Sequence, residues 1–155
     1  MKPTDSMAAT IRELAVFCLE HRGTKCLRDC DAAKVFRYVA FHLLNGTLFV
    51  ARDKNRKVQI ITFAWLDDSV EVVRRAAADE SQFNWQPTRN DGDSLLVGDV
   101  IGQRRWFGKI VEQIKARWPD SPRKRLFTYR GEKPALKEFD LNTVLRFAYV
   151  HSQNT

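Results

Sequence analysis

The fold is decided by the stretch Ser94–Trp118, which reads SLLVGDVIGQRRWFGKIVEQIKARW. Residues 94–101 form a short, mostly apolar run, which predicts a buried strand. From 105 to 117 the apolar residues recur on one face of a helix, and Pro119 ends it. A second strand is predicted over 125–130. A strand–helix–strand unit of this kind predicts a sheet with a helix packed against it.

Upstream of this unit the hydrophobic period changes from that of a helix to that of a strand. Two amphipathic helices come first, with a polar break at Gly23–Asp31 between them. The stretches Thr47–Ala51 and Val58–Trp65 are rich in β-branched and aromatic residues and flank a turn at 53–56, so they predict a hairpin. A short helix opening at Asp68 or Ser69 follows. The apolar faces of the first two helices are Met7, Ile11, Leu14, Ala15 and Cys18, then Val35, Phe36, Val39, Ala40 and Leu43.

Three further segments complete the expected order. Residues 81–93 are polar and rich in turn formers, which predicts a long loop. Pro134–Phe139 is interpreted as a turn or short helix, and 144–150 as the last strand. The expected fold class is α/β (α+β): a mixed, mostly antiparallel sheet flanked by helices, in a single domain over residues 1–155.

Composition and charge restrict the classes of protein that fit. The chain has 155 residues, and no apolar run approaches the ~18 residues that span a bilayer. The first residues lack the apolar segment of an export signal, and three scattered cysteines suit a reducing compartment, so a soluble, cytoplasmic protein without a metal site is expected. The net charge of +7 favours an acidic partner.

The order of elements is similar to that of the GNAT superfamily of acyltransferases, without its first strand. In that superfamily the turn from the central strand into the next helix carries Gln/Arg-x-x-Gly-x-Gly/Ala, and its N–H groups hold the coenzyme A pyrophosphate. Arg105-x-x-Gly108 matches the first part here, and Ile110 stands in place of the small residue. The resemblance implies that Arg104, Arg105, Gly108 and Lys109 bind the acyl donor.

A second resemblance is to the bacterial toxin-activating lysine acyltransferases, a GNAT-like family. In that family a Gly-Asp pair precedes a strand that ends in a catalytic Asp, and the following helix closes with an aromatic residue, Pro and Asp. The matching residues here are Gly92-Asp93, Asp99 and Trp118-Pro119-Asp120, in the same order and spacing. The likeness extends over about residues 35–140 and includes Leu48–Asp53, Phe63–Trp65, Leu126–Arg130 and Leu136–Phe139.

This resemblance implies transfer of a fatty acyl group from a carrier thioester to a protein lysine. Acyl carrier protein or acyl-CoA would be the donor, with no tightly bound cofactor. The family's catalytic pair is a His and the strand Asp, which implies His21 with Asp99. Cys26 occupies the place of the His in an ungapped comparison and stays an alternative. An imidazole suits the role of base because it titrates near ~6.5.

Two other functions fit the same sequence. Arg and Lys clusters interleaved with Trp106, Phe107 and Trp118 are also typical of a nucleic-acid-binding module, although these aromatics lie on the predicted core face. A non-catalytic GNAT-like interaction protein is the second alternative, because the His is displaced and the cofactor turn is incomplete. A homodimer is left open.

Overall fold

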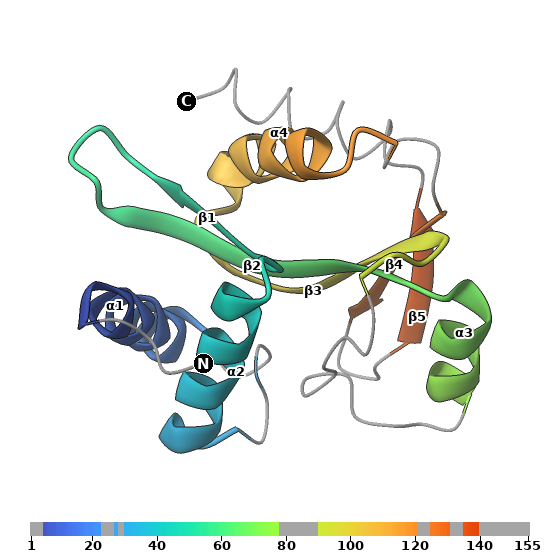
Figure 1. Cartoon of the computed structure of the whole chain (residues 1–155), viewed down its shortest axis with the longest axis horizontal. Coiled ribbons are helices and arrows are strands. Elements are labelled where there is room, and N and C mark those ends of the chain that lie inside the picture. The colour runs from blue at the N-terminus through green and yellow to red at the C-terminus, as the bar shows by residue number, and fades with distance from the viewer. Residues whose placement is uncertain are drawn as a thin grey trace.

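The computed structural model describes residues 5–22, 27, 30–77, 90–120, 125–130 and 135–139, with the backbone alone for 73, 75–77 and the last two ranges. The fold is a mixed sheet with helices on both faces (Figure 1). The elements are α1 (Asp5–His21), α2 (Ala32–Leu44), β1 (Leu48–Arg52), β2 (Val58–Asp67), α3 (Ser69–Ala77), β3 (Ser94–Gly102), the 3-10 turn η1 (Arg104–Trp106), α4 (Phe107–Arg117), β4 (Arg125–Arg130) and β5 (Ala135–Phe139).

The sheet has the strand order β1-β2-β3-β4-β5 and is mostly antiparallel. The only parallel pair among these strands is β3–β4, which α4 connects. This arrangement confirms the fold class expected from the sequence. It also confirms the predicted hairpin, in which Leu48 pairs with Phe63, and the position of the 94–101 strand beside it, where Asp67 pairs with Ser94.

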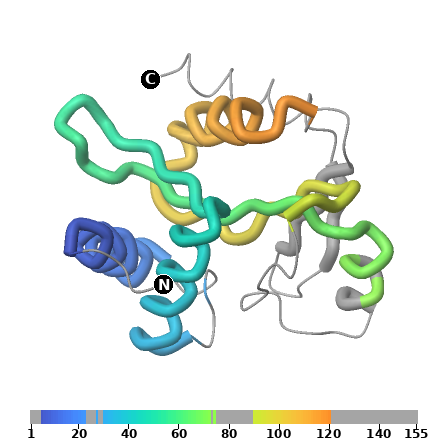
Figure 2. The backbone as a smooth tube through the Cα atoms, in the orientation of Figure 1, coloured from blue at the N-terminus to red at the C-terminus, as the bar shows by residue number. Residues whose placement is uncertain are grey.

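The two faces of the sheet hold separate cores. The helices α1 and α2 cover one face and α4 covers the other, as the backbone trace also shows (Figure 2). Because β2 is central, it contributes to both: Phe63 and Trp65 point toward α1 and α2, whereas Ile60 and Ala64 point toward α4. Alternation of this kind along one strand explains the nearly continuous apolar run from 60 to 66.

The helix α2 turns a different face to the core than its most apolar stripe predicts. Its buried residues are Val35, Tyr38, Val39 and His42, at the i, i+3, i+4, i+7 spacing of one helical face. The predicted residues Phe36, Ala40 and Leu43 lie at the edges of that face and are partly buried. Asp31 caps the helix by accepting the Lys34 N–H.

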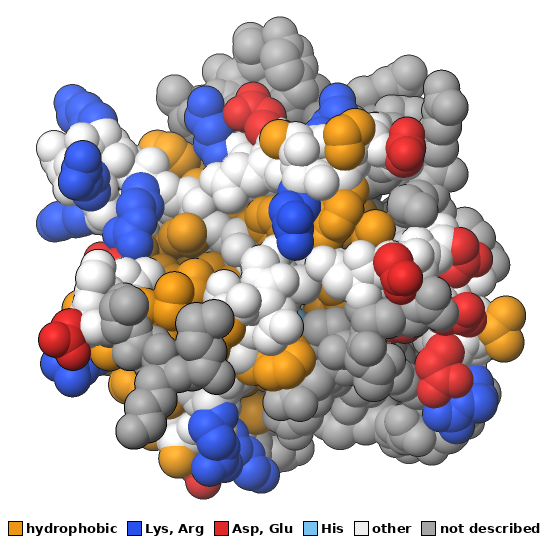
Figure 3. Space-filling view, viewed as in Figure 1, with side chains coloured by type: hydrophobic (Ala, Val, Ile, Leu, Met, Phe, Trp, Pro, Cys, Tyr) orange, Lys and Arg blue, Asp and Glu red, His pale blue; other side chains and the backbone are white. Residues whose placement is uncertain are grey.

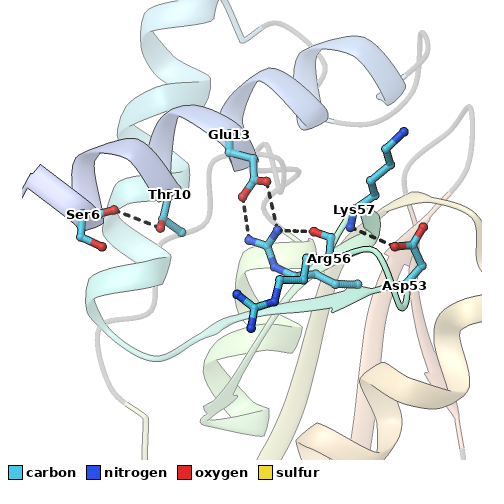
Figure 4. A network of polar contacts seen from close by, with 7 residues as sticks. Ser6, Thr10, Glu13, Asp53, Arg56 and Lys57 are labelled. Atoms are coloured by element: carbon cyan, nitrogen blue, oxygen red, sulfur yellow. Dashed lines mark hydrogen bonds and ion pairs between the residues drawn. The ribbon is translucent and has the colours of Figure 1, made fainter.

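Hydrogen bonds in the turn and an ion pair to α1 fix the tip of the β1–β2 hairpin (Figure 4). In the turn, Asp53 accepts the backbone N–H groups of Asn55 and Lys57 at 2.8 and 3.0 Å. Arg52 forms a two-pronged ion pair with Glu13 of α1 and also donates to the Arg56 carbonyl at 3.0 Å. The tip therefore presents exposed cations at Lys54, Arg56 and Lys57, and the Lys and Arg side chains at this end of the hairpin are visible in Figure 3.

One element was predicted wrongly. The segment Pro134–Phe139 was interpreted as a turn or short helix, but Ala135–Phe139 is the strand β5, paired antiparallel with β4. Alanine, leucine, lysine and glutamate favour a helix locally, and pairing with the neighbouring strand overrides this preference. The predicted strand over 144–150 and most of the 81–93 loop lie outside the described residues. None of the described helices has the length and apolar character needed to cross a membrane.

Candidate functional site

The centre of β3 contains a bulge. Thr62 of β2 pairs with Val100 and Ala64 pairs with Val97, so Phe63 alone stands opposite two residues, Gly98 and Asp99. A bulge bends the strand and re-aims the side chains beside it, and bulges are common next to functional sites. The Thr62 hydroxyl donates to the backbone carbonyl of Asp99 at 2.9 Å and so satisfies a group displaced by the bulge.

The bulge coincides with the point where the parallel strands separate. The β3–β4 ladder runs from Ser94 paired with Arg125 to Val97 paired with Thr128, and it ends there. Both strands continue, β3 to Gly102 and β4 to Arg130. The first residues beyond the ladder on β3 are therefore the bulged pair Gly98 and Asp99. An extended ligand can add to a strand at such an opening through main-chain hydrogen bonds.

Asp99 lies on the α1/α2 side of the sheet and is partly buried. Its Oδ2 accepts the Leu27 backbone N–H at 2.9 Å. Burial raises the pKa of Asp99 from its ordinary 3.8 to about 6, and the hydrogen bond from Leu27, which favours the carboxylate, opposes part of this rise. At neutral pH the group is mostly ionised and is a stronger base than an ordinary carboxylate.

Leu27 is buried, and its backbone is held by the side chain of Arg22. Leu27 is fully buried and has a φ of 50°, a left-handed conformation that is uncommon outside glycine. Arg22, which follows α1, donates to the Cys30 carbonyl at 2.6 Å and also approaches the Leu27 carbonyl at 3.5 Å. This clamp holds the Leu27 N–H in place against Asp99.

Tyr38 of α2 is a member of the site that the sequence patterns did not indicate. Its ring is buried and packs on Phe63 and His42 at centroid distances of 4.7 and 4.4 Å. Burial raises the pKa of Tyr38 well above its ordinary value of 10.0, and nearby Asp99, Cys30 and Cys18 add to the rise electrostatically. The signal in the sequence was helical spacing, since Tyr38 lies three residues after Val35 on the buried face of α2.

His42 is a buried imidazole on the same face, and its role is in the core. The Thr47 hydroxyl can donate to the His42 carbonyl at 3.3 Å, which leaves its oxygen to accept the Nδ1 proton of His42 at 2.7 Å. Nε2 is then an acceptor, and it has no hydrogen-bond partner in the described part of the chain. Burial lowers the pKa of His42 from 6.5 to about 3, so the ring is neutral at physiological pH.

Of the two candidates for the catalytic base, His21 lies within the described residues. His21 is the last residue of α1, is exposed, and stacks on Phe17 with 4.3 Å between ring centroids. Phe17 in turn lies close to Gly102 at the end of β3. No hydrogen bond or ion pair joins His21 to Asp99 among the described residues. Cys26 lies outside them.

The predicted donor-binding residues follow β3 directly. Arg104 and Arg105 lie in η1, and Gly108 and Lys109 in the first turn of α4. The three cations are exposed, and the Nζ of Lys109 is 3.9 Å from the Glu112 carboxylate. The Trp106 and Phe107 N–H groups already donate to the carbonyls of residues 103 and 104. An anion at this turn would therefore be held mainly by side chains.

The motifs Gly92-Asp93 and Trp118-Pro119-Asp120, which flank β3 and α4, have structural roles. Asp93 accepts both the backbone N–H and the hydroxyl of Ser69, at 2.8 and 2.7 Å, and so caps α3. Gly92 lies against the Asp67 backbone, where an added Cβ would come within 2.0 Å of the carbonyl oxygen. At the other motif, Trp118 ends α4 and packs edge-on against Phe49 at 5.6 Å.

Within the described ranges no three His, Cys, Asp or Glu side chains are grouped closely enough to hold a metal ion. No protein-family model, curated protein or solved structure matches this chain.

Proposed function

We propose that this protein is an acyltransferase that moves an acyl group from a carrier thioester to a protein lysine, with Asp99 at the reacting centre. The observation that carries the proposal is the coincidence of the β3 bulge, the end of the β3–β4 ladder and a carboxyl group of raised pKa. The mixed sheet with one parallel pair, and the resemblance to toxin-activating lysine acyltransferases, favour the same function, in the cytoplasm.

The opening between β3 and β4 suits the donor. The arm that carries an acyl group on a carrier protein or coenzyme A is extended and contains amides, which can pair with strand backbone. The exposed cations at Arg104, Arg105 and Lys109 follow the end of β3, five to ten residues beyond Asp99 of the bulge. They complement the negative charge of an acidic carrier protein or of coenzyme A phosphates.

Asp99 suits the acceptor. A lysine ammonium must lose a proton before its nitrogen can attack, and a carboxylate of pKa about 6 accepts protons better than an exposed one. His21 stays the predicted base in a pair with Asp99, which would then orient the imidazole and stabilise its cation. The lack of a bond between His21 and Asp99 in the described residues favours a second candidate, a non-catalytic interaction protein with the same fold.

The test uses acyl carrier protein charged in turn with short and long saturated acyl chains, and a lysine-rich peptide as acceptor. We expect release of the carrier thiol and formation of an amide on the peptide, both followed by mass spectrometry. Arg105→Glu should weaken carrier binding several-fold at low salt and less at high salt, because screening removes long-range attraction. Arg37→Glu, which reverses an exposed charge on α2, is the matched control.

Two outcomes would refute parts of this proposal. Absence of thiol release with every chain length would leave the non-catalytic interaction protein as the better account. Steeply salt-dependent binding of single-stranded DNA, with no binding of carrier protein, would favour the nucleic-acid-binding module instead.

A further inference from the structure

The bulge places a glycine beneath the hydroxyl of Tyr38. An ideal Cβ built on Gly98 would lie 3.8 Å from the Tyr38 Oη and 3.4 Å from the Phe63 carbonyl oxygen. In a bulge the two consecutive residues project to the same side of the strand, so this position adjoins the Asp99 carboxyl. Because residue 98 has no side chain, the space between the hydroxyl and the strand is not filled by residue 98 itself.

The Tyr38 ring is held firmly, and its hydroxyl makes no hydrogen bond to another described residue. The Tyr38 ring is fixed by packing on Phe63 and His42, and its side chain is 6% exposed. Among the described residues its Oη has no hydrogen-bond partner, although buried tyrosine hydroxyls usually have one. A fixed donor with no partner among the described residues, beside a carboxylate and where a strand ladder ends, is the arrangement expected of a group that binds substrate.

We propose that the Tyr38 hydroxyl donates a hydrogen bond to the carbonyl oxygen of the acyl thioester, seated over Gly98 beside Asp99. The inference rests on the proposed function and adds to it the residue that stabilises the negative oxygen. It also assigns a purpose to the glycine at position 98, whose missing methyl group would lie 3.8 Å from the hydroxyl and so leaves that space to the carbonyl oxygen.

Acyl transfer by these groups proceeds by addition of the lysine nitrogen and loss of the carrier thiolate. The lysine nitrogen, after giving one proton to the base, attacks the carbonyl carbon, and a C–N bond forms while the carbonyl π electrons move to oxygen. Tyr38 donates to that oxygen. When the oxygen lone pair re-forms the C=O bond, the C–S bond breaks and the carrier leaves as a thiolate. The nitrogen loses its second proton and the thiolate gains one, so the products are an amide and a thiol.

Tyr38 acts as a hydrogen-bond donor in this step and does not give up its proton. Burial and the neighbouring Asp99 hold the pKa of Tyr38 well above its ordinary range, so the phenol stays protonated at neutral pH. A donor that remains in place stabilises the oxyanion without any reorganisation during the reaction.

The test compares Tyr38→Phe, Gly98→Ala and the control Thr10→Val. Thr10→Val removes a hydroxyl from α1 that bonds only within the helix, at 3.1 Å from the Ser6 carbonyl. Tyr38→Phe should lower kcat by about 10²–10³, the loss typical of one oxyanion donor, with little change in KM or melting temperature. Gly98→Ala makes ordinary contacts and should fold, but its methyl group fills the space above the strand and should raise KM.

A spectroscopic measurement distinguishes this inference from a merely structural role. An acyl carrier protein with a ¹³C-labelled thioester carbonyl is bound in an Asp99→Asn background, where turnover is slow. The infrared stretching frequency of the labelled carbonyl should be lower in the complex than in free solution. Adding Tyr38→Phe should return this frequency to the solution value. An unchanged rate or an unchanged stretch in Tyr38→Phe would overturn the inference while leaving the acyltransferase proposal intact. A wild-type protein that transfers no acyl group would overturn both.

Discussion

The dipeptide Gly-Asp occurs twice around β3, once just before the strand and once at its centre, and the two copies have opposite properties. At Gly92-Asp93 the carboxylate caps α3, and hydrogen bonds from the Ser69 hydroxyl and Ser69 backbone hold the pKa of Asp93 below its ordinary value. At Gly98-Asp99 the carboxyl is partly buried at a bulge, and desolvation raises its pKa to about 6. The glycines differ as well, since Gly92 is pressed against backbone and Gly98 adjoins a tyrosine hydroxyl.

The comparison shows that the residue types do not decide the role. Hydrogen bonds that favour the charged form make the first carboxylate a stable structural anion. Removal from water makes the second a stronger base, which is useful in chemistry and unfavourable for stability. Of the two carboxylates, only Asp99 adjoins the bulge and the end of the β3–β4 ladder.

The largest expected difference between the two carboxylates is in catalysis. Asp99→Asn keeps the shape and can still accept the Leu27 N–H, but it removes the charge. We expect acyl transfer to fall by up to about 10⁴, the loss seen when a triad aspartate in another enzyme class becomes asparagine. Asp93→Asn should leave the rate within about twofold. Initial rates of thiol release from acyl carrier protein measure both.

Equal rates in the two variants would contradict a catalytic role for Asp99 alone. A loss of rate in both would show that the Asp93 cap of α3 also affects the geometry of the site. The double variants Asp99→Asn/His21→Ala and Asp99→Asn/Cys26→Ser extend the test. Groups that act as one unit lose activity non-additively, so the variant that adds nothing to Asp99→Asn identifies the partner base.

The two glycine variants should differ by less than the two carboxylate variants, and they should differ in the free energy of unfolding. Gly92→Ala forces a methyl group to within 2.0 Å of the Asp67 carbonyl oxygen, and backbone cannot move aside as a side chain can. We expect a loss of about 3 kcal/mol or more in the free energy of unfolding. Gly98→Ala meets only ordinary contacts and should change it by less than about 1 kcal/mol. Urea unfolding of both variants decides the matter, and a comparable loss in both would contradict this account of the bulge.

The sequence predicted the elements better than the site. The order of helices and strands from 5 to 130 follows from local patterns, because apolar periodicity reports which face each element buries. β5 was missed because strand pairing overrides helix preference. The environment of Asp99 depends on Leu27, 72 residues away in the chain, and no local pattern contains that contact.

Tyr38 illustrates the same limit within a single helix. Helical spacing places it on the buried face of α2, yet nothing in the spacing shows that its hydroxyl faces the bulge. His21 and Asp99 were paired by resemblance to a family, and the described residues contain no bond between them. A site assembled from α1, α2 and β3 depends on tertiary contacts, which a single sequence does not display.

The smallest expected effect is the pH dependence of stability, where the two carboxylates should act in opposite directions. The pKa of Asp93 is lower in the folded state, so its contribution to stability is present at neutral pH and is lost as the pH falls through that lowered pKa. Asp93→Asn should therefore cost only about a few tenths of a kcal/mol near neutral pH, because asparagine caps nearly as well and the exposed charge is screened, and progressively less below about pH 4. The pKa of Asp99 is higher in the folded state, so its contribution is fully present below 3.8 and is lost as the pH rises through about 6. Asp99→Asn should therefore gain stability relative to the wild type as the pH rises from 4 to 7, because only the wild type loses the contribution of its protonated carboxyl. Urea unfolding of the three proteins across this range gives the two difference curves, and parallel curves would mean that Asp99 is as well solvated as Asp93.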